Sequence, residues 1–115
     1  IKNLFVIYCW QHNEVLMKII VDLCIVPIGV GTSLSEYIAE CQKVITKAGL
    51  KHELHANGTA IEGEWDSVFI AIKKCHAVVH HMGAPRIHTN IKLGTRNDKN
   101  QSIDQKISSV KSFLN

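Results

Sequence analysis

The stretch Asn57–Asp66 (NGTAIEGEWD) constrains the fold more than any other part of this sequence. Asn-Gly fits the two central positions of a type I′ turn, because both residues tolerate a positive φ angle. The segments on either side, residues 50–56 and 59–64, are therefore predicted to pair as a β-hairpin. Trp65 and Asp66 then begin an amphipathic helix, where Asp66 interacts favourably with the helix dipole. The middle of the chain is thus expected to run strand, turn, strand, helix.

Residues 18–49 predict one more strand and one more helix ahead of this stretch. Residues 18–28 (KIIVDLCIVPI) form a long run rich in β-branched side chains, which is typical of a strand. Ser33 and Glu36 have the spacing of a capping box, and apolar residues then recur at helical intervals up to Gly49, which favours a C-terminal stop. We therefore expect a helix that begins at Ser33 and ends at Gly49.

Three further elements are expected after the hairpin. Apolar residues at helical spacing predict a helix over residues 65–81, and strict alternation predicts a strand over residues 86–94. A third helix is expected over residues 100–114, with four apolar residues facing inward: Ile103, Ile107, Val110 and Leu114. The order βαββαβ plus a terminal helix predicts an α+β fold of ferredoxin-like type, in which a four-stranded antiparallel sheet carries two helices on one face.

The chain has the size of a single domain. It contains 115 residues, of which 46% are hydrophobic, so it can bury a core without disulfides or metals. Residues 17–115 are expected to form this domain. Residues 1–16 are interpreted as an extension outside the core, either an extra edge strand or a segment foreign to the native protein. Its apolar run is far shorter than the roughly 20 residues of a membrane-spanning helix, so no membrane association is expected.

The strand over residues 18–28 has apolar residues on both of its faces. The face expected to meet the helices consists of Ile19, Val21, Leu23 and Ile25. The opposite face is also largely apolar, apart from Asp22. Since both helices share one side of the sheet, this second face needs another cover. We expect a partner subunit, a ligand or both to supply it, and therefore a homo-oligomer.

Several function classes lack support in the sequence. The net charge of +3 is mild and evenly scattered, so nucleic-acid binding is not expected. No GxSxG, HExxH or GxxxxGK[ST] motif occurs, and the histidines are spread over three elements, so we expect no catalytic residue, metal site or cofactor. The four cysteines form no CxxC pair, which is typical of reduced thiols in a cytoplasmic protein.

Glu62 and Trp65 are the first candidates for a ligand site. Because side chains alternate along a strand, Glu62 is expected to project from the face opposite to Ile61, close to a tryptophan. A carboxylate beside an aromatic ring suits a flat, positively charged ligand with N–H donors, such as an aminopyrimidine. The alternative is that Glu62 is a solvated strand residue and that Trp65 belongs to the core.

A second group of candidates lies toward the C-terminus. Arg86 and Thr89 belong to the alternating strand, and Arg96 and Asp98 follow it. Arg96 and Asp98 either pair with each other, cap the third helix or contact a ligand. His76 lies in the apolar stripe of the second helix, so it is either a hydrogen-bonded core residue or points into a pocket.

Three separated blocks of the sequence resemble the small thiamine-binding-protein-like family. They are VPIG at residues 26–29, GTAIEGEWD at 58–66 followed by His76, and RIHTNIKLGTRNDK at 86–99. The resemblance covers about residues 17–114. It implies a ferredoxin-like fold assembled through sheet-to-sheet dimers, often as dimers of dimers. It also implies binding of thiamine or its hydroxymethylpyrimidine moiety, without known catalysis.

The resemblance also implies a set of ligand-binding residues. Carried over by motif, they are Thr59, Glu62, Trp65, His76, Arg86, Thr89, Arg96 and Asp98, with Ser33 and Ser35 as looser candidates. The leading hypothesis is a non-catalytic cytoplasmic dimer or tetramer that binds thiamine or a related pyrimidine. The alternative is a structural or interaction protein whose oligomeric surface, rather than its pocket, carries the role. An enzyme, such as an acylphosphatase with the same fold, ranks third.

Overall fold

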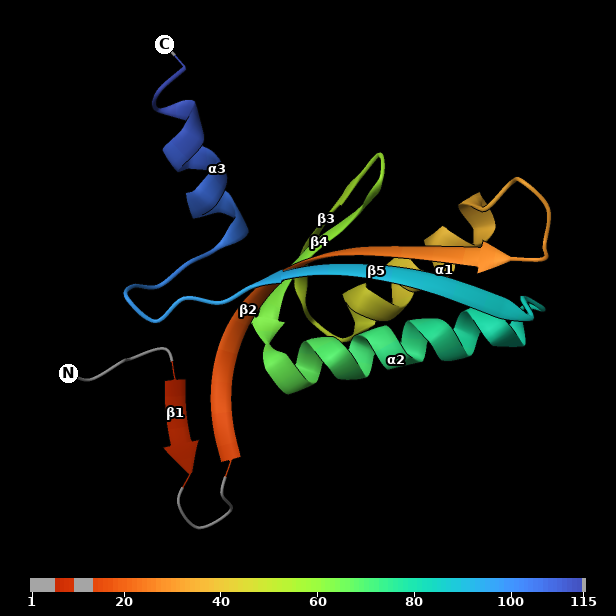
Figure 1. Ribbon diagram of the computed structural model, residues 1–115, viewed down its shortest axis with the longest axis horizontal. Coiled ribbons are helices and arrows are strands. Elements are labelled where there is room, and N and C mark those ends of the chain that lie inside the picture. Colours follow the sequence, from red (N-terminus) through yellow and green to blue (C-terminus); the bar gives the residue numbers. More distant parts are fainter. Residues whose placement is uncertain (1–5, 10–13, 115) are drawn as a thin grey trace.

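The computed structural model describes residues 6–9 and 14–114, and a twisted antiparallel sheet covered by two helices forms its centre (Figure 1). Four strands lie in the order β3-β4-β2-β5: β2 (Glu14–Ile28), β3 (Lys51–His55), β4 (Gly58–Glu64) and β5 (Arg86–Gly94). The helices α1 (Ser35–Lys47) and α2 (Trp65–His81) contact each other and the same side of the sheet. This arrangement confirms the predicted α+β fold of ferredoxin-like type.

The core lies between the sheet and the two helices. The predicted inner face of β2 is confirmed, because Ile19, Val21, Leu23 and Ile25 are all buried. Ile61 of β4 joins them, and the helices contribute Cys41, Ile45, Val68, Ile72, Cys75 and Val79. Each fully buried aliphatic side chain contributes on the order of 1.5–3 kcal/mol relative to an exposed one, so this layer supplies most of the driving force for folding.

β2 is longer than expected and pairs with an additional strand. It begins at Glu14, and β1 (Val6–Cys9) lies antiparallel to its first four residues, with Val6 opposite Met17. The pairing of β2 with β4 starts only at Lys18, so β1 lies beyond the four-stranded sheet (Figure 1). Residues 6–9 therefore form an additional strand at this end of β2, and the question whether the extension belongs to the native protein stays open. Residues 1–5 and 10–13 of the expected extension lie outside the described residues, and the domain boundary at residue 17 stays a prediction.

The predicted β-hairpin is confirmed, but its turn lies one residue earlier than expected. His55 pairs with Gly58, so the central turn residues are Ala56 and Asn57 rather than Asn57 and Gly58. Gly58 has another role, because a Cβ atom there would lie 2.8 Å from the carbonyl oxygen of Leu23. Glycine thus allows β4 to approach β2 closely, where any side chain would be too near the backbone.

The predicted capping box at Ser33 and Glu36 is wrong. α1 begins at Ser35, its N-cap is Leu34, and no side chain caps it. Leu34 is half-buried and faces a cavity under the helix. Leu34 therefore stands at the cap position where a hydrogen-bonding side chain would otherwise stabilise the helix. The missing cap costs about 1 kcal/mol of stability. α2 keeps its predicted bounds, and its N-cap Glu64 accepts a hydrogen bond from the backbone N–H of Ser67.

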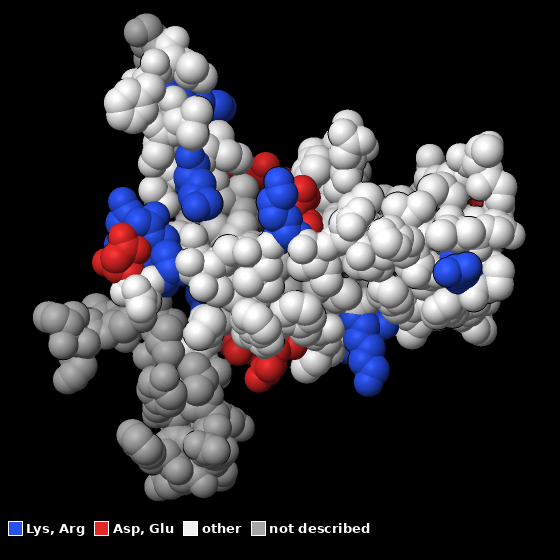
Figure 2. Space-filling view, in the orientation of Figure 1, with Lys and Arg blue, Asp and Glu red and all other residues white. Residues whose placement is uncertain are grey.

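α3 (Ile103–Lys111) is shorter than the predicted helix over residues 100–114, and its predicted inward face is wrong. Ile103 is buried, but the other apolar residues are exposed: Ile107, Val110, Phe113 and Leu114. The reason is the path of residues 95–102, which carries α3 away from the sheet (Figure 1). Figure 2 shows mostly uncharged surface over α3 with a few basic side chains. Within the described part of the chain, no helix is long and apolar enough to cross a membrane.

Candidate functional site

A cavity of about 610 Å³ opens between α1 and the β3–β4 hairpin, over the C-terminal half of β2. Apolar side chains from β2 and α1 form much of its wall, among them Leu23, Ile25, Ile38 and Ile45. Polar residues of α1 and of the hairpin also line it: Ser35, Gln42, His55, Asn57 and Thr59. Small-molecule sites are commonly clefts of about 300–1,000 Å³ with apolar walls and a few convergent polar groups, which is the composition found here.

Gln42 and Thr59 form a partly buried side-chain contact at the wall of this cavity. The Gln42 Nε2 amide donates to the Thr59 hydroxyl oxygen at 2.9 Å. Thr59 is only 4% exposed, because it lies opposite Leu23 on the helix-facing side of β4. Gln42 was not predicted as a site residue. Its signal in the sequence is its spacing, four residues after Ile38 and three before Ile45, which places it on the inner face of α1.

His55 lies at the hairpin end of the cavity and is paired with Asp22 of β2. Its Nε2 atom is 2.7 Å from Asp22 Oδ1, and its Nδ1 atom accepts the backbone N–H of Asn57 at 3.3 Å. With Nδ1 acting as acceptor, Nε2 carries the proton that it donates to the carboxylate. The pair therefore holds the imidazole in one orientation. Asp22 itself alternates with the buried Val21 and Leu23, so it lies on the sheet face away from the helices and does not line the cavity.

Only two of the ten predicted ligand-binding residues line this cavity, Thr59 and Ser35. Ser33 is an exposed residue that precedes α1. The remaining seven belong to other parts of the fold: Glu62, Trp65, His76, Arg86, Thr89, Arg96 and Asp98. The predicted residues therefore do not form one cluster, although smaller groups of them come together.

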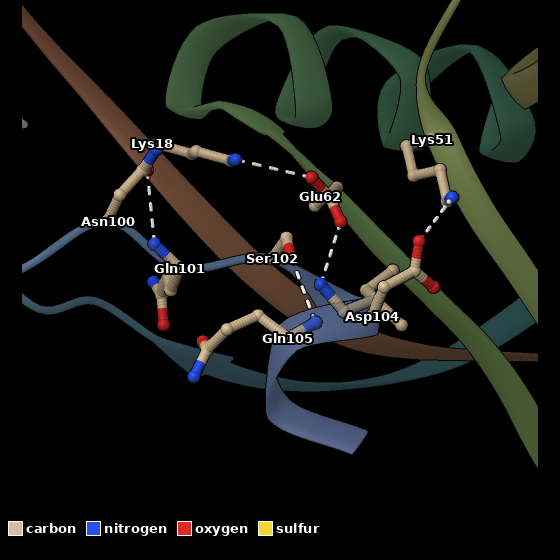
Figure 3. A network of polar contacts seen from close by, with 9 residues as sticks. Lys18, Lys51, Glu62, Asn100, Gln101, Ser102, Asp104 and Gln105 are labelled. Carbon is tan, nitrogen blue, oxygen red and sulfur yellow. Dashed lines mark hydrogen bonds and ion pairs between the residues drawn. The ribbon is translucent and has the colours of Figure 1, made fainter. Parts of the chain in front are cut away.

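Glu62 joins the sheet to α3. On the side of the sheet away from the helices, its Oε2 atom is 3.2 Å from Lys18 Nζ, and its Oε1 atom accepts the backbone N–H of Ile103 at 2.8 Å (Figure 3). Trp65 is the first residue of α2, and its ring contacts Phe69 with centroids 5.1 Å apart. Glu62 and Trp65, which were expected to lie close together, thus have different contact partners. Side-chain alternation along β4 places Glu62 on the outer face of the sheet, whereas Trp65 already belongs to α2.

His76 and Thr89 are two predicted residues that do meet. His76 Nε2 of α2 lies 2.7 Å from the Thr89 hydroxyl of β5. Burial lowers the pKa of His76, and the neighbouring His80, with ring centroids 6.4 Å apart, lowers it further. A neutral imidazole at this position can exchange donor and acceptor roles with the hydroxyl, which suits a structural link between helix and strand.

Arg96 and Asp98 pair with each other in the segment between β5 and α3, one of the alternatives left open by the sequence. The guanidinium group donates two hydrogen bonds of 2.6 Å to the carboxylate. This bidentate contact lowers the pKa of Asp98 to about 2. Both Asp98 and Arg86 are exposed. Within the described residues, no three His, Cys, Asp or Glu side chains are grouped so as to hold a metal ion.

Comparison with known proteins gives several similar chains. UPF0045 protein sll0230 of Synechocystis is 56% identical over 98 residues, which cover 85% of this chain and 81% of the relative. UPF0045 protein ECM15 of Eremothecium gossypii is 42% identical, covering 83% and 91%. The crystal structure of MJ1052 from Methanocaldococcus jannaschii has a TM-score of 0.77 at 31% identity and covers 84% of this chain and 98% of that one.

Two further comparisons refer to thiamine. A Thermotoga maritima protein, TM0486, described in terms of thiamine biosynthesis or salvage, has a TM-score of 0.69 at 22% identity, covering 81% of this chain and 98% of that one. That level of identity supports the shared fold alone. A family model described as thiamine-binding protein matches residues 21–111. Since this match spans most of the chain, the protein belongs to the thiamine-binding protein family.

Proposed function

We propose that this protein binds thiamine or a related aminopyrimidine, without transforming it, in the cavity between α1 and the β3–β4 hairpin. The observation that carries the proposal is the cavity itself, about 610 Å³ with apolar walls and a partly buried Gln42–Thr59 contact. Membership of the thiamine-binding protein family supports the ligand class. Glu62 and Trp65, the first candidates, do not line this cavity, so their place in a ligand site is not part of the proposal.

The lining of the cavity favours the pyrimidine part of such a ligand. Among the described residues that line it there is no Asp, Glu, Lys or Arg. Leu23, Ile25 and Ile45 offer apolar surface to the two faces of a flat ring, while the hydroxyl and amide groups of the lining can hydrogen-bond to its edge.

Binding rather than catalysis is proposed because of the state of His55. It is the one imidazole among the described residues that line the cavity, and each of its ring nitrogens has a partner, Asp22 or the backbone of Asn57. A general base needs a nitrogen within reach of the substrate. We place the protein in the cytosol, since Cys24, Cys41 and Cys75 are free thiols, as in a reducing compartment.

Calorimetry with thiamine and with hydroxymethylpyrimidine tests the proposal. Thr59→Val removes one hydroxyl without changing the shape, so the affinity should fall by about fivefold to tenfold, the value of one hydrogen bond. Thr46→Val, an exposed residue of α1 outside the cavity, is the matched control. Absence of heat at millimolar ligand with well-folded protein would overturn the proposal. If Thr89→Val lowers the affinity and Thr59→Val does not, the ligand site lies at the contact between α2 and β5 instead.

We also infer that copies of this chain associate through α3 together with the sheet face opposite to α1 and α2. Large apolar side chains are exposed on α3 and just after its end: Val110 of α3 is 61% accessible, and Phe113 and Leu114, which follow the helix, are 87% and 74% accessible. Exposed apolar groups of this density are more typical of an interface than of a monomer surface. The same observation favours the second candidate function, that of an interaction protein in which the assembly rather than the cavity carries the role.

A further inference from the structure

Gln42 and Thr59 together offer one hydrogen-bond donor and one acceptor, side by side, at the wall of the cavity. The Gln42 Nε2 amide donates to Thr59 Oγ1 at 2.9 Å, so the hydroxyl oxygen acts as acceptor within the pair. The hydroxyl hydrogen of Thr59 then points away from Gln42, and the Oε1 atom of Gln42 keeps its lone pairs. Both residues line the cavity. A ligand there meets an O–H donor next to a carbonyl acceptor.

We infer that this pair recognises the edge of a 4-aminopyrimidine formed by the ring nitrogen N3 and the adjacent exocyclic amine. The ring nitrogen accepts the hydroxyl hydrogen of Thr59, and the amine donates to Gln42 Oε1. The inference rests on the proposed function and deepens it, because it names the chemical group that is recognised. It also adds Gln42, which no sequence motif pointed to, as a specificity-determining residue.

The surroundings of the pair fit a flat aromatic ring. Ile38 and Ile45 lie one turn before and after Gln42 on α1, and Leu23 is opposite Thr59 on β2. These aliphatic side chains can cover the faces of a ring whose edge meets the polar pair. Thr59 is 4% exposed, so protein encloses it apart from the small part that lines the cavity. A ligand that fails to match it leaves a buried polar group unpaired, and such sites discriminate strongly.

The orientation of Gln42 sets the preference between an amino and an oxo group. A 4-oxopyrimidine presents the opposite pattern, an N3–H donor beside a carbonyl acceptor. To bind it, the Gln42 amide would have to rotate by half a turn, and the Thr59 hydroxyl would have to donate to Gln42 instead of accepting from it. The Nε2-to-Oγ1 contact of 2.9 Å in this structure is the arrangement that suits the amine.

The test compares 4-amino-5-hydroxymethyl-2-methylpyrimidine with its 4-oxo analogue by calorimetry. Wild-type protein should bind the amino compound at least tenfold more tightly. Gln42→Leu should weaken binding of the amino compound about tenfold and reduce the preference to less than about threefold. Gln105→Leu, on α3, is the control for the same change of side chain outside the cavity and should leave both values unchanged. If Gln42→Leu does not fold, Thr59→Val should show the same loss of preference.

The outcomes separate this inference from the function on which it rests. Equal binding of both compounds by the wild-type protein, or an unchanged preference in Gln42→Leu, overturns the recognition by Gln42 and Thr59 while pyrimidine binding stands. Binding of neither compound by folded wild-type protein overturns both. A preference that disappears only when Gln42 or Thr59 is changed supports the inference.

Discussion

Individual residues in this protein take their roles from the element they face rather than from their neighbours in the sequence. Glu62 is two residues from Glu64 on the same strand face, yet Glu62 binds the start of α3 and Glu64 caps α2. The pairing of Glu62 with Lys18 and with the Ile103 N–H satisfies a carboxylate that is mostly buried. Its role is therefore to attach α3 to the sheet.

Substitution of Glu62 should affect stability and leave ligand affinity unchanged. Glu62→Ala removes the acceptor for the Ile103 N–H and the partner of Lys18, and should lower the free energy of unfolding by about 1–3 kcal/mol. Glu62→Gln keeps an acceptor oxygen and should cost less. Urea unfolding measures the first effect and calorimetry with thiamine the second. A fall in thiamine affinity for Glu62→Gln, in folded protein, would place this carboxylate in the ligand site after all.

His76 should make the stability depend on pH. Its pKa is lowered below 6.5 by burial and by His80, so the unfolded chain binds a proton at a higher pH than the folded protein does. The free energy of unfolding should therefore decrease as the pH falls from 7 through 6.5 toward 5. Urea unfolding of the wild type and of His76→Gln at several pH values isolates this group. The decrease should be smaller in the variant, and identical curves would contradict the assignment.

At the scale of elements, the contact between β2 and β4 determines where the hairpin turns. β4 approaches β2 so closely at Gly58 that a Cβ atom would lie 2.8 Å from Leu23 O and 3.0 Å from Asp22 Oδ1. This register places Thr59 opposite Leu23, on the wall of the cavity. The Asn-Gly pair predicted a hairpin correctly, but local turn preference did not decide which two residues formed the turn.

Gly58→Ala should destabilise the protein, whereas Gly94→Ala should not. The added methyl group at Gly58 meets backbone, so the strands must separate, at a cost of about 1–3 kcal/mol. At Gly94 a Cβ atom meets nothing within 4 Å and the backbone needs no positive φ, so alanine should be neutral or slightly stabilising. The free energy of unfolding in urea measures both. Equal effects of the two substitutions would contradict the close-approach role of Gly58.

At the scale of the whole molecule, α1 and α2 cover one face of the sheet, and among residues 6–9 and 14–114 no helix packs over most of the other face or over the exposed side of α3. Ile103 holds α3 at its start, and beyond it Val110, Phe113 and Leu114 are exposed. In the sequence, the apolar spacing of this helix predicted burial against the domain's own core. The same spacing serves equally well for burial against another chain, and the pattern alone does not distinguish the two.

Val110→Asp should reduce self-association without unfolding the chain. A charge in an apolar interface is costly, whereas on a 61% exposed monomer surface it changes stability by less than about 0.5 kcal/mol. Light scattering should show a dimer or larger assembly for the wild type at micromolar concentration and a smaller species for the variant. Ser108→Asp, exposed on the same helix, is the control. A wild-type monomer would overturn the proposed association.

The sequence by itself determined the order of the elements, the inner face of β2, the bounds of α2 and β5, and the family. These features follow from the periodicity of the apolar residues and from separated motifs, and both can be recognised in the sequence without knowledge of long-range contacts. Tertiary structure alone decided the turn at Ala56, the cap at Leu34, the exposure of α3 and the contact of Gln42 with Thr59. Each of these depends on how closely two elements approach in space, and no local pattern contains that distance.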